Sequence, residues 1–321
     1  MRVGDMAAVS ISIVSWNSME SLPKCLDLVY KQTFRDFEVI LVDNASVDGV
    51  LEFVGSYYPD VRVVRNAENE GFCQAHNRAI RLSDSQFFMP LNPDVFLTSA
   101  YVEKLVEALD SHHDVGIVVG KMYVEEGSDI LDGAGLAINK VRRQYLRGHR
   151  QRDNGQFDSP EYVFGACGAA PLYRRAMLDD IELEGEYFDE LFFAHKEDLD
   201  LSWRAQLYGW KCLYVPDAIA YHNRSFSPLK RKQMPKVVRL HAVKNRYLAI
   251  IKNDLPSLFL RHLVYILWYD IRILGYLALF ERSSFEGIVR VLQLLPQILR
   301  RRKIIMQKKR VTDAYMGQWF Q

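Results

Sequence analysis

The chain of 321 residues is 49% hydrophobic, and 41 basic against 40 acidic side chains leave a formal net charge of +1. These values exclude a disordered protein and predict a large buried core, as one domain with an appendage or as two domains. Its four cysteines form no CxxC pair and no zinc-ligand spacing, so we expect reduced thiols in a cytosolic protein.

The first 125 residues alternate between strand and helix patterns. The apolar run at 8–16 is too short and too β-branched for a signal peptide and predicts a buried strand. Such alternation predicts βαβ units and a mostly parallel sheet with right-handed crossovers. Further strands are expected at 37–46, 61–66, 86–91 and 115–124, and helices at 20–31, 47–58, 72–83 and 99–112.

The pattern loosens after residue 125. Residues 127–157 are rich in Gly, Asp and Arg, and we interpret them as an irregular, substrate-facing excursion. Small residues at 163–175 predict a close-packed turn and strand. A helix is expected at 196–210, opened by acidic residues and ended by Gly209, and a pair of strands at 211–222.

Polar side chains follow each of the first four predicted strands. The carboxyl ends of parallel strands meet at one edge of a sheet, where ligands bind in such folds, so we expect one cleft there. Asn, Asp and Ser also favour helix N-caps, and capping is the alternative for each residue taken singly. In chain order these residues are Ser15, Trp16, Asn17, Asp43, Asn44, Ser46, Asp48, Asn66, the segment NEGF that begins at Asn69, Asn92 and Asp94.

Two common phosphate-binding motifs are missing from the chain. There is no GxxxxGK[ST] loop, and no GxGxxG follows the first strand, which argues against a nicotinamide or flavin dehydrogenase. A nucleoside diphosphate bound at the predicted cleft would need a divalent cation to neutralise its phosphates. Carboxylates such as Asp94 are suited to hold that cation.

Five segments occur in a characteristic order: VSISIVSWNSMESLPKCLDLVYKQTFRDFEVILVDNASVDG, NEGFCQAHNRA, LNPDVFL, YFDELFFAHKEDLDLSWRAQLYGW and PDAIAYH. Over residues 8–225 the chain thereby resembles glycosyltransferase family 2, and within it the rhamnosyltransferase-like branch of bacterial O-antigen and cell-wall polysaccharide synthesis. The resemblance implies the GT-A fold, with a Rossmann-like central sheet flanked by helices. The implied catalytic domain is 1–225, with a nucleotide-binding half at about 8–125 and an acceptor half at about 126–225.

The resemblance also assigns roles to the polar residues at the cleft. Asp43 would accept a hydrogen bond from the pyrimidine N3–H of the donor, with Asn17 and Asp48 near the base or ribose. The implied donor-binding set is completed by Ser15, Asn69, Asn77 and Asn92.

The segment Asn92-Pro93-Asp94 occupies the place of the family's DxD motif, with an amide where many members carry a carboxylate. Asp94 is then the implied ligand of Mg²⁺ or Mn²⁺. His222 matches a position that supplies an imidazole to the same ion in some relatives. A histidine after a strand is equally consistent with a simple hydrogen-bonded residue.

A second group of carboxylates lies in KEDLD at 196–200. The resemblance places the catalytic base on Asp198, with Glu197 as the alternative. A carboxylate here would take the proton of the acceptor hydroxyl as that oxygen attacks the anomeric carbon, in one displacement that inverts the configuration. The structural alternative is that acidic residues stabilise the start of the helix through its dipole.

The charge is divided unevenly along the chain. Residues 1–220 contain 21 Lys and Arg against 35 Asp and Glu, a net charge of 21 − 35 = −14, and residues 221–321 contain 20 against 5, a net of 20 − 5 = +15. We expect residues 226–321 to form a basic helical region. A basic segment of this kind predicts a nucleic-acid or membrane partner, and no nucleic-acid motif accompanies it.

The apolar stretch 255–280 is interrupted by charged residues and so is not a clean transmembrane span. We predict an interfacial helix, followed by a polybasic patch at 300–310 with seven basic residues in eleven, on an anionic membrane leaflet. The alternative is a helix packed on the catalytic domain or in a dimer.

The predicted function is that of an inverting glycosyltransferase at the cytoplasmic face of the bacterial cell membrane. It would move a sugar, rhamnose from its thymidine-diphosphate donor, to a hydroxyl of a lipid-linked glycan. The alternatives are a UDP-hexose or UDP-N-acetylhexosamine transferase of the same fold and a non-catalytic membrane scaffold. A sugar nucleotidyltransferase is disfavoured, because it needs a glycine-rich basic loop where Ser-Trp-Asn-Ser stands.

Overall fold

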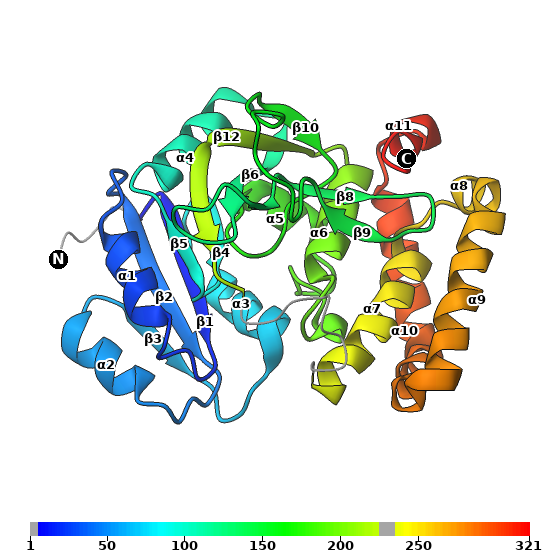
Figure 1. The fold of residues 1–321 in the computed structure, drawn as a ribbon, viewed down its shortest axis with the longest axis horizontal. Helices are drawn as coiled ribbons and strands as arrows, with labels where there is room; N and C mark the ends of the chain where they lie inside the picture. The colour runs from blue at the N-terminus through cyan, green and yellow to red at the C-terminus, as the bar shows by residue number, and fades with distance from the viewer. Residues whose placement is uncertain (1–5, 225–234) are drawn as a thin grey trace.

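The computed structural model describes residues 6–224 and 235–321, drawn in Figure 1. Within this part the chain is built around a ten-stranded mixed sheet. In spatial order its main path is β10 (Glu161–Val163), β12 (Lys211–His222), β6 (Val115–Tyr123), β11 (Leu172–Arg174), β4 (Phe87–Leu91), β1 (Val9–Ser15), β2 (Phe37–Asp43) and β3 (Arg62–Arg65). Off this path, β5 (Val95–Leu97) pairs with β12 and β7 (Leu131–Gly133) pairs with β6. A separate hairpin joins β8 (Leu136–Ile138) to β9 (Gln144–Leu146).

The N-terminal half has the predicted βαβ organisation. Strands β1, β2, β3 and β4 are mutually parallel, and the register sets Ser15 directly beside Asp43 at their carboxyl ends. Because successive side chains of a strand point to opposite faces, Val9, Ile11 and Ile13 all enter one core layer. Helices α1 (Leu22–Tyr30), α2 (Val50–Tyr57) and α4 (Tyr101–Ser111) pack on that face.

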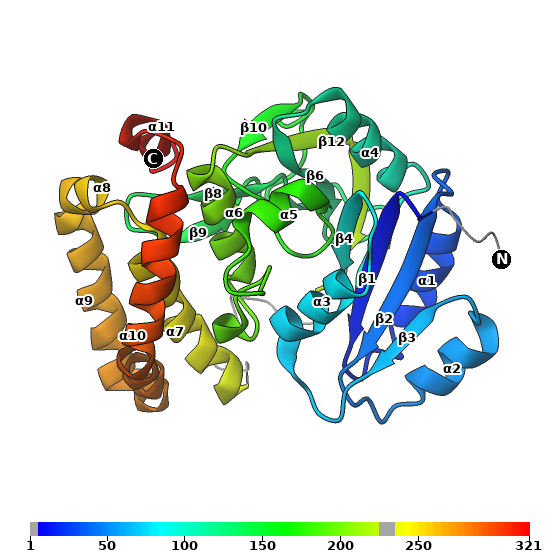
Figure 2. The same ribbon diagram turned by 180° about the vertical axis from the view of Figure 1, so that it is seen from behind.

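The opposite face carries α3 (Gly71–Arg81), α5 (Arg175–Ile181) and α6 (Glu197–Leu207), which lie in front of the sheet in Figure 2. One detail of this region was left open by the sequence analysis, and a second differs from it. Strand β11 runs antiparallel to both of its neighbours, β4 and β6. The expected strand pair at 211–222 is a single strand, whose register shifts between Val215 and Ile219 around Pro216, since proline cannot donate a ladder hydrogen bond.

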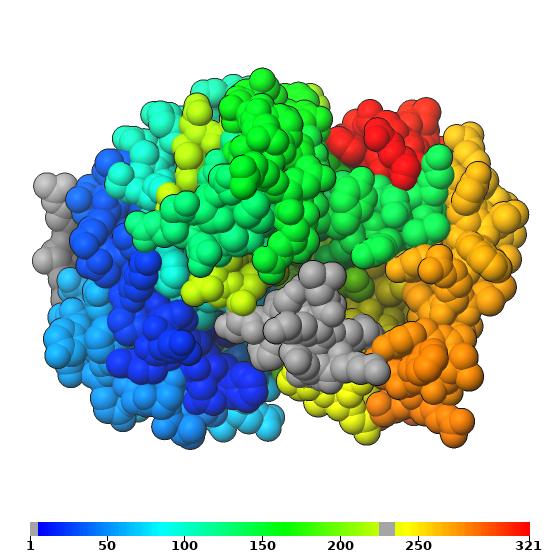
Figure 3. Space-filling model, viewed as in Figure 1, coloured from blue at the N-terminus to red at the C-terminus, as the bar shows by residue number. Residues whose placement is uncertain are grey.

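The C-terminal region is helical, as predicted, but its long helices pack on the catalytic half. The packing helices are α7 (Lys236–Asn253) and α10 (Phe285–Lys308), and Leu248, Ile298 and Ile305 belong to the same apolar core as α6. The predicted apolar helix is divided into α8 (Pro256–Arg261) and α9 (Leu263–Phe280). In Figure 3, α9 forms the outer rim of the molecule on the side away from the nucleotide-binding half. The remaining short helix is α11 (Asp313–Gly317), with single turns η1 (Glu190–Phe192) and η3 (Arg282–Ser284).

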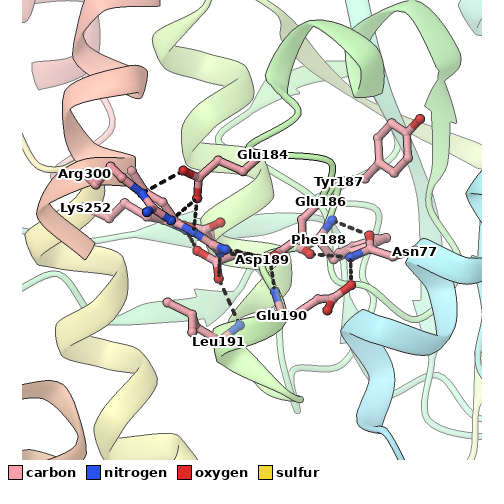
Figure 4. A network of polar contacts seen from close by, with 12 residues as sticks. Asn77, Glu184, Glu186, Tyr187, Phe188, Asp189, Glu190, Leu191, Lys252 and Arg300 are labelled. Carbon is pink, nitrogen blue, oxygen red and sulfur yellow. Dashed lines mark hydrogen bonds and ion pairs between the residues drawn. The ribbon is translucent and has the colours of Figure 1, made fainter. Parts of the chain in front are cut away.

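Charged residues join the two parts, as Figure 4 shows. Lys252 of α7 forms ion pairs with Asp189 and, at 2.8 Å, with Asp200. Arg301 of α10 pairs with Asp189 at 2.5 Å and with Glu186 at 2.7 Å. The uneven charge along the chain is therefore neutralised within one folded unit.

The same kind of pairing involves most of the polybasic segment predicted at 300–310. Six of its seven basic residues contact acidic side chains or carbonyl oxygens of the chain, while Lys303 has no such partner in the described residues. Arg301 is buried, and its guanidinium cannot reach a membrane surface. Arg300, Arg301 and Arg310 of this segment form ion pairs with acidic residues at 180–189 and so attach the end of α10 and the residues after it to the catalytic half.

Candidate active site

The carboxyl ends of β1 and β2 form one wall of the site. The Asp43 carboxylate accepts a hydrogen bond from the backbone N–H of Ser46 at 3.1 Å through Oδ2. Its Oδ1 atom is buried without a hydrogen-bond partner, and so is the Ser15 hydroxyl beside it. Unsatisfied buried acceptors carry an energetic cost, so a ligand that donates an N–H here would be stabilised.

Asn17 and Asp48 fasten the two loops that follow these strands. Asn17, in a left-handed conformation with φ of 54°, accepts from the N–H of Val47 at 2.9 Å. Asp48 accepts from the N–H of Met19 at 2.7 Å. Trp16, which is 59% exposed, stands beside them, and its indole face is available for stacking. Sequence reasoning assigned no role to Trp16, although an exposed Trp at a strand end is a usable signal.

The two remaining asparagines of this half differ in their access to a ligand. Asn69 accepts from the N–H of Gly71 and from the Asn44 amide, at the start of α3. Asn77 is fully buried, and its amide bonds to the backbone of Phe188 and to Glu190. Asn77 thus presents no free polar atom to the cleft and ties α3 to residues 188–190 instead, which removes it from the donor-binding set.

Asp94 and His222 lie together beyond β4 and β12. The Nε2 atom of His222 is 3.5 Å from the Asp94 carboxylate, and its Nδ1 atom is 3.0 Å from the carboxylate of Asp132. Arg224 donates two hydrogen bonds to Asp132. Burial opposes protonation of His222, but the hydrogen bonds to Asp132 and Asp94 outweigh it and raise the pKa of the imidazole. Sequence reasoning missed Asp132 and Arg224, because Asp132 lies in the segment interpreted as irregular.

The chemistry of this pair fits a divalent cation. One carboxylate and one imidazole nitrogen are suitable donors, and Mg²⁺ and Mn²⁺ bind in proteins with few protein ligands when substrate phosphates and water complete the shell. Asp132 holds His222 by its other nitrogen, the arrangement that orients metal-bound histidines. Asn92 has no side-chain hydrogen bond within the described residues. Across those residues, no three His, Cys, Asp or Glu side chains converge to bind a metal alone.

Asp198 and Glu197 occupy the first turn of α6. Asp198 accepts from the N–H of Leu199 at 2.7 Å and from the amide of Gln144 at 3.5 Å through the same oxygen, Oδ1. Burial and the neighbouring charge of Asp198 raise the pKa of Glu197 to about 8. Glu197 therefore keeps its proton at neutral pH and is the poorer base of the two.

The backbone that leads into this turn is strained. Phe193, His195 and Lys196 all adopt positive φ angles, between 64° and 69°, which cost energy in residues other than glycine. Asn245 of α7 donates hydrogen bonds to the carbonyls of Phe192, Ala194 and His195, and so holds the loop in place. This positioning role was invisible in the sequence, because Asn245 is 50 residues away in a helix without a motif.

The segment 167–169 connects the walls of the site. A side chain added at Gly168 would contact the Phe72 ring at 3.4 Å and the carboxyl group of Glu197 at 3.6 Å. The next residue, Ala169, accepts a hydrogen bond from the N–H of Asn92 at 2.8 Å. On its other side, Cys167 lies 3.7 Å from the Arg224 guanidinium that binds Asp132. Asn92, the Arg224 side chain that binds Asp132 beside His222, and the carboxyls of α6 are thus arranged around residues 167–169.

Comparisons with known proteins agree with this geometry. The family model "Glycosyl transferase family 2" matches residues 10–182. The chain is 25% identical over 237 residues to an N-acetylglucosaminyl-diphospho-decaprenol L-rhamnosyltransferase of Mycobacterium tuberculosis, covering 67% of this chain and 75% of the relative. It is 21% identical over 234 residues to the glycosyltransferase GlyG of Streptococcus pneumoniae, covering 70% and 73%.

Solved structures share the fold. TarS of S. aureus, residues 1–349, superposes with a TM-score of 0.58 at 17% identity, over 97% of this chain and 88% of that one. GalNAc-T7, solved with UDP, GalNAc and Mn²⁺, gives the same TM-score at 17% identity, over 77% of this chain. The chain spans about half the length of GalNAc-T7, 48%. The expected GT-A fold is confirmed, and the chain belongs to glycosyl transferase family 2.

Proposed function

We propose that the protein is an inverting glycosyltransferase that moves rhamnose from its thymidine-diphosphate donor to a hydroxyl of a lipid-linked glycan at the cytoplasmic face of the bacterial membrane. The observation that carries the proposal is the convergence on residues 167–169. Cys167 contacts Arg224, which binds the Asp132 carboxylate that holds His222 beside Asp94. Gly168 lies against the first turn of α6, which carries Asp198. The orphaned acceptor on Asp43 lies at the carboxyl end of β2, on the sheet edge where β4 leads into Asn92.

The donor nucleotide would lie against β1 and β2. The free Oδ1 atom of Asp43 accepts the N3–H of a uracil or thymine, which every pyrimidine of this type presents. Ser15 lies beside Asp43 and its hydroxyl is also free. Asn17 and Asp48 shape the neighbouring loops, and Asn69 the start of α3. Asn92 stands between the nucleotide edge and the metal pair, with its amide free to bond to ribose or phosphate oxygen.

Asp94 and His222 would hold a divalent cation, Mg²⁺ or Mn²⁺, at the donor's diphosphate. When bound, such a cation offsets the negative charge that develops on the departing nucleoside diphosphate. Asp132 and Arg224 fix the imidazole, so that its Nε2 atom points at Asp94.

Asp198 would accept the proton of the acceptor hydroxyl as that oxygen attacks the anomeric carbon. One of its oxygens is used by Leu199 and Gln144, and the other has no partner in the described part of the chain. Burial and the neighbouring carboxyl raise the pKa of Glu197 to about 8, which leaves Asp198 as the better candidate for the base. A single displacement of this kind inverts the anomeric configuration and needs no covalent sugar–enzyme intermediate.

Relatives support the choice of donor and acceptor without deciding it. A rhamnosyltransferase that acts on a diphospho-decaprenol acceptor is among them. TarS has been solved with UDP-GlcNAc, and a Pyrobaculum mannosyltransferase with GDP-Man and Mn²⁺. A transferase that uses a UDP-hexose or UDP-N-acetylhexosamine is therefore the second candidate, and both share the base and the metal pair.

The test is a panel of nucleotide sugars incubated with the purified protein, with Mg²⁺, with Mn²⁺ and with chelator. Release of the nucleoside diphosphate from dTDP-rhamnose should exceed release from UDP-glucose and UDP-N-acetylglucosamine. Asp198→Asn should lower transfer to an acceptor by about 10²- to 10⁴-fold, the usual contribution of a positioned base. Turnover of no nucleotide sugar under any condition would favour the non-catalytic scaffold.

A further inference from the structure

A pocket of about 470 Å³ lies between the α8–α9 side of the molecule and the catalytic half. Its walls come from the turn before β9, from Lys196 before α6, and from the facing sides of α7 and α9. Five basic side chains and no Asp or Glu are among its lining residues, which also include three tyrosines. A concave, carboxylate-free site of this kind favours an anion.

Three of the five cations are unpaired. Arg142 is neutralised by Asp254, and Arg246 by Asp270. Arg143, Lys196 and Arg272 have no ion pair and no side-chain hydrogen bond to any residue that the structure describes. Most basic side chains of the C-terminal helices are paired within the chain, so three unpaired cations around one hollow favour an anion from outside the chain.

The pocket lies next to Asp198, the proposed catalytic base. Gln144 lines it and donates a hydrogen bond to Asp198 at 3.5 Å, and Lys196 directly precedes Glu197 in the chain. An anionic group held in the pocket would therefore place the part of the molecule attached to it near the carboxylate that activates the acceptor hydroxyl. The donor edge at Asp43 lies at the opposite end of the site, beyond Phe72 and Gly168.

Helix α9 forms the outer wall of the pocket, and the face of α9 that points away from the pocket is apolar. Tyr269, Arg272 and Tyr276 of α9 line the pocket, while the other faces of the helix are exposed and hydrophobic. Helix α9 is, by length and composition alone, long and apolar enough to cross a membrane. The exposed apolar side chains of α8 and α9 are Leu260, Val264, Leu267, Trp268, Ile271, Leu274, Leu279 and Phe280. A hydrocarbon chain leaving the pocket would meet this surface at once.

We propose that this pocket binds the phosphate or diphosphate of the lipid-linked acceptor, with Arg143, Lys196 and Arg272 as its ligands and α9 as the guide for the lipid chain. The inference rests on the proposed function and adds the place of the acceptor to it. Arginine and lysine suit this task, because hydrogen bonds from cations to phosphate oxygens are short and strong. The tyrosines of the pocket can donate further hydrogen bonds to the same oxygens.

The experiment is a calorimetric titration of the full chain with farnesyl diphosphate, below its micelle concentration, and with farnesol. Two double variants are compared. Arg143→Gln/Arg272→Gln removes two pocket cations, and Arg261→Gln/Lys303→Gln removes two exposed cations of the same region outside the pocket. Both lose the same charge, and urea midpoints establish that both fold.

We expect farnesyl diphosphate to bind the wild type at least about tenfold more tightly than farnesol, because two or more charged hydrogen bonds are added. The pocket variant should weaken that binding about tenfold or more, and the control variant less than about twofold. Adding thymidine diphosphate with Mg²⁺ should not displace the probe. Equal affinities of the two variants, or displacement by the nucleotide, would overturn the inference.

Two further measurements distinguish binding of the acceptor phosphate from binding of membrane lipid headgroups, and from a failure of the proposed function. Binding to phosphatidylglycerol vesicles should fall equally in both variants, and a selective loss in the pocket variant would assign these cations to membrane lipids and sink the proposal. Donor hydrolysis by the wild type is measured in parallel. Absence of donor hydrolysis would refute the proposed function. The titration alone decides whether the pocket binds the acceptor phosphate.

Discussion

Helices α9 and α10 are neighbours in the same basic, apolar stretch, yet they face opposite environments. α10 buries Arg301 against Asp189 and Glu186 and places Ile298 and Ile305 in the core of the catalytic half. Only 11% of the 18 residues of α9 are buried, and the helix exposes Val264, Trp268 and other large apolar side chains. One helix therefore holds the fold together, and the other is available for an external partner.

The largest expected effect is a loss of stability on substitution of Arg301 in α10. Arg301→Met should destabilise the protein by about 2–4 kcal/mol, because it removes a buried guanidinium that Asp189 shares with Lys252 and that also pairs with the partly buried Glu186. Arg272→Met on α9 should change the free energy of unfolding by less than about 0.5 kcal/mol. Urea unfolding of both variants measures the difference, and similar losses in the two would break the comparison.

The presence or absence of an ion pair also gives two buried carboxyls of α6 opposite pKa shifts. Asp200 is buried, but Lys252 and Arg204 more than offset that burial and lower the pKa of its carboxyl. Glu197 forms no ion pair with any residue that the structure describes, and burial raises its pKa to about 8. The folded state thus binds a proton on Glu197 that the unfolded state releases above about pH 4.5, so the contribution of Glu197 to the free energy of unfolding should fall as the pH rises from about 5 to 8.

Glu197→Gln should remove this dependence. The variant should gain stability over the wild type, by up to a few kcal/mol, progressively between about pH 5 and 8, and the gain should level off above pH 8. Urea midpoints at pH 5, 6.5 and 8 report it. A constant difference across that range would mean that Glu197 is already ionised in the folded protein.

The contribution of α7 to catalysis can be measured at Asn245. Asn245→Ala removes three hydrogen bonds to the strained loop before α6 and should cost about 1–3 kcal/mol in stability. Transfer activity should fall further than stability explains, with kcat reduced more than KM is changed, because Asp198 loses its position. Asn253→Ala, on the same helix, removes one hydrogen bond to Asp200 and serves as the matched control. Equal kcat values in the two variants would contradict a positioning role.

The smallest effect on stability is expected on α9. Leu267→Glu/Ile271→Glu places charges on exposed positions and should leave the urea midpoint within the equivalent of about 0.5 kcal/mol. Flotation with anionic liposomes should nevertheless fall severalfold if this surface meets a membrane. Val289→Glu/Leu292→Glu, also exposed but on α10, is the control and should float as the wild type does. Truncation near residue 250 is unsuitable for this test, because α10 completes the core.

The sequence by itself determined the βαβ half and the order of its polar strand ends. Period-two alternation and β-branched runs are local signals, and parallel pairing then brings Ser15, Asp43 and Asn92 to one edge by geometry alone. The motif order was sufficient for the family, and KEDLD for the start of α6.

Tertiary structure alone decided which of these polar groups are free to bind a ligand. Asn77 looked like a donor ligand, yet folding consumes its amide on Phe188 and Glu190, whereas Asp43 keeps an unpartnered oxygen. The basic patch at 300–310 looked like a membrane surface, yet Arg300, Arg301 and Arg310 form ion pairs with acidic residues of the catalytic half. Hydrogen bonds and ion pairs between residues far apart in the chain depend on how helices pack, and local sequence carries no record of that packing.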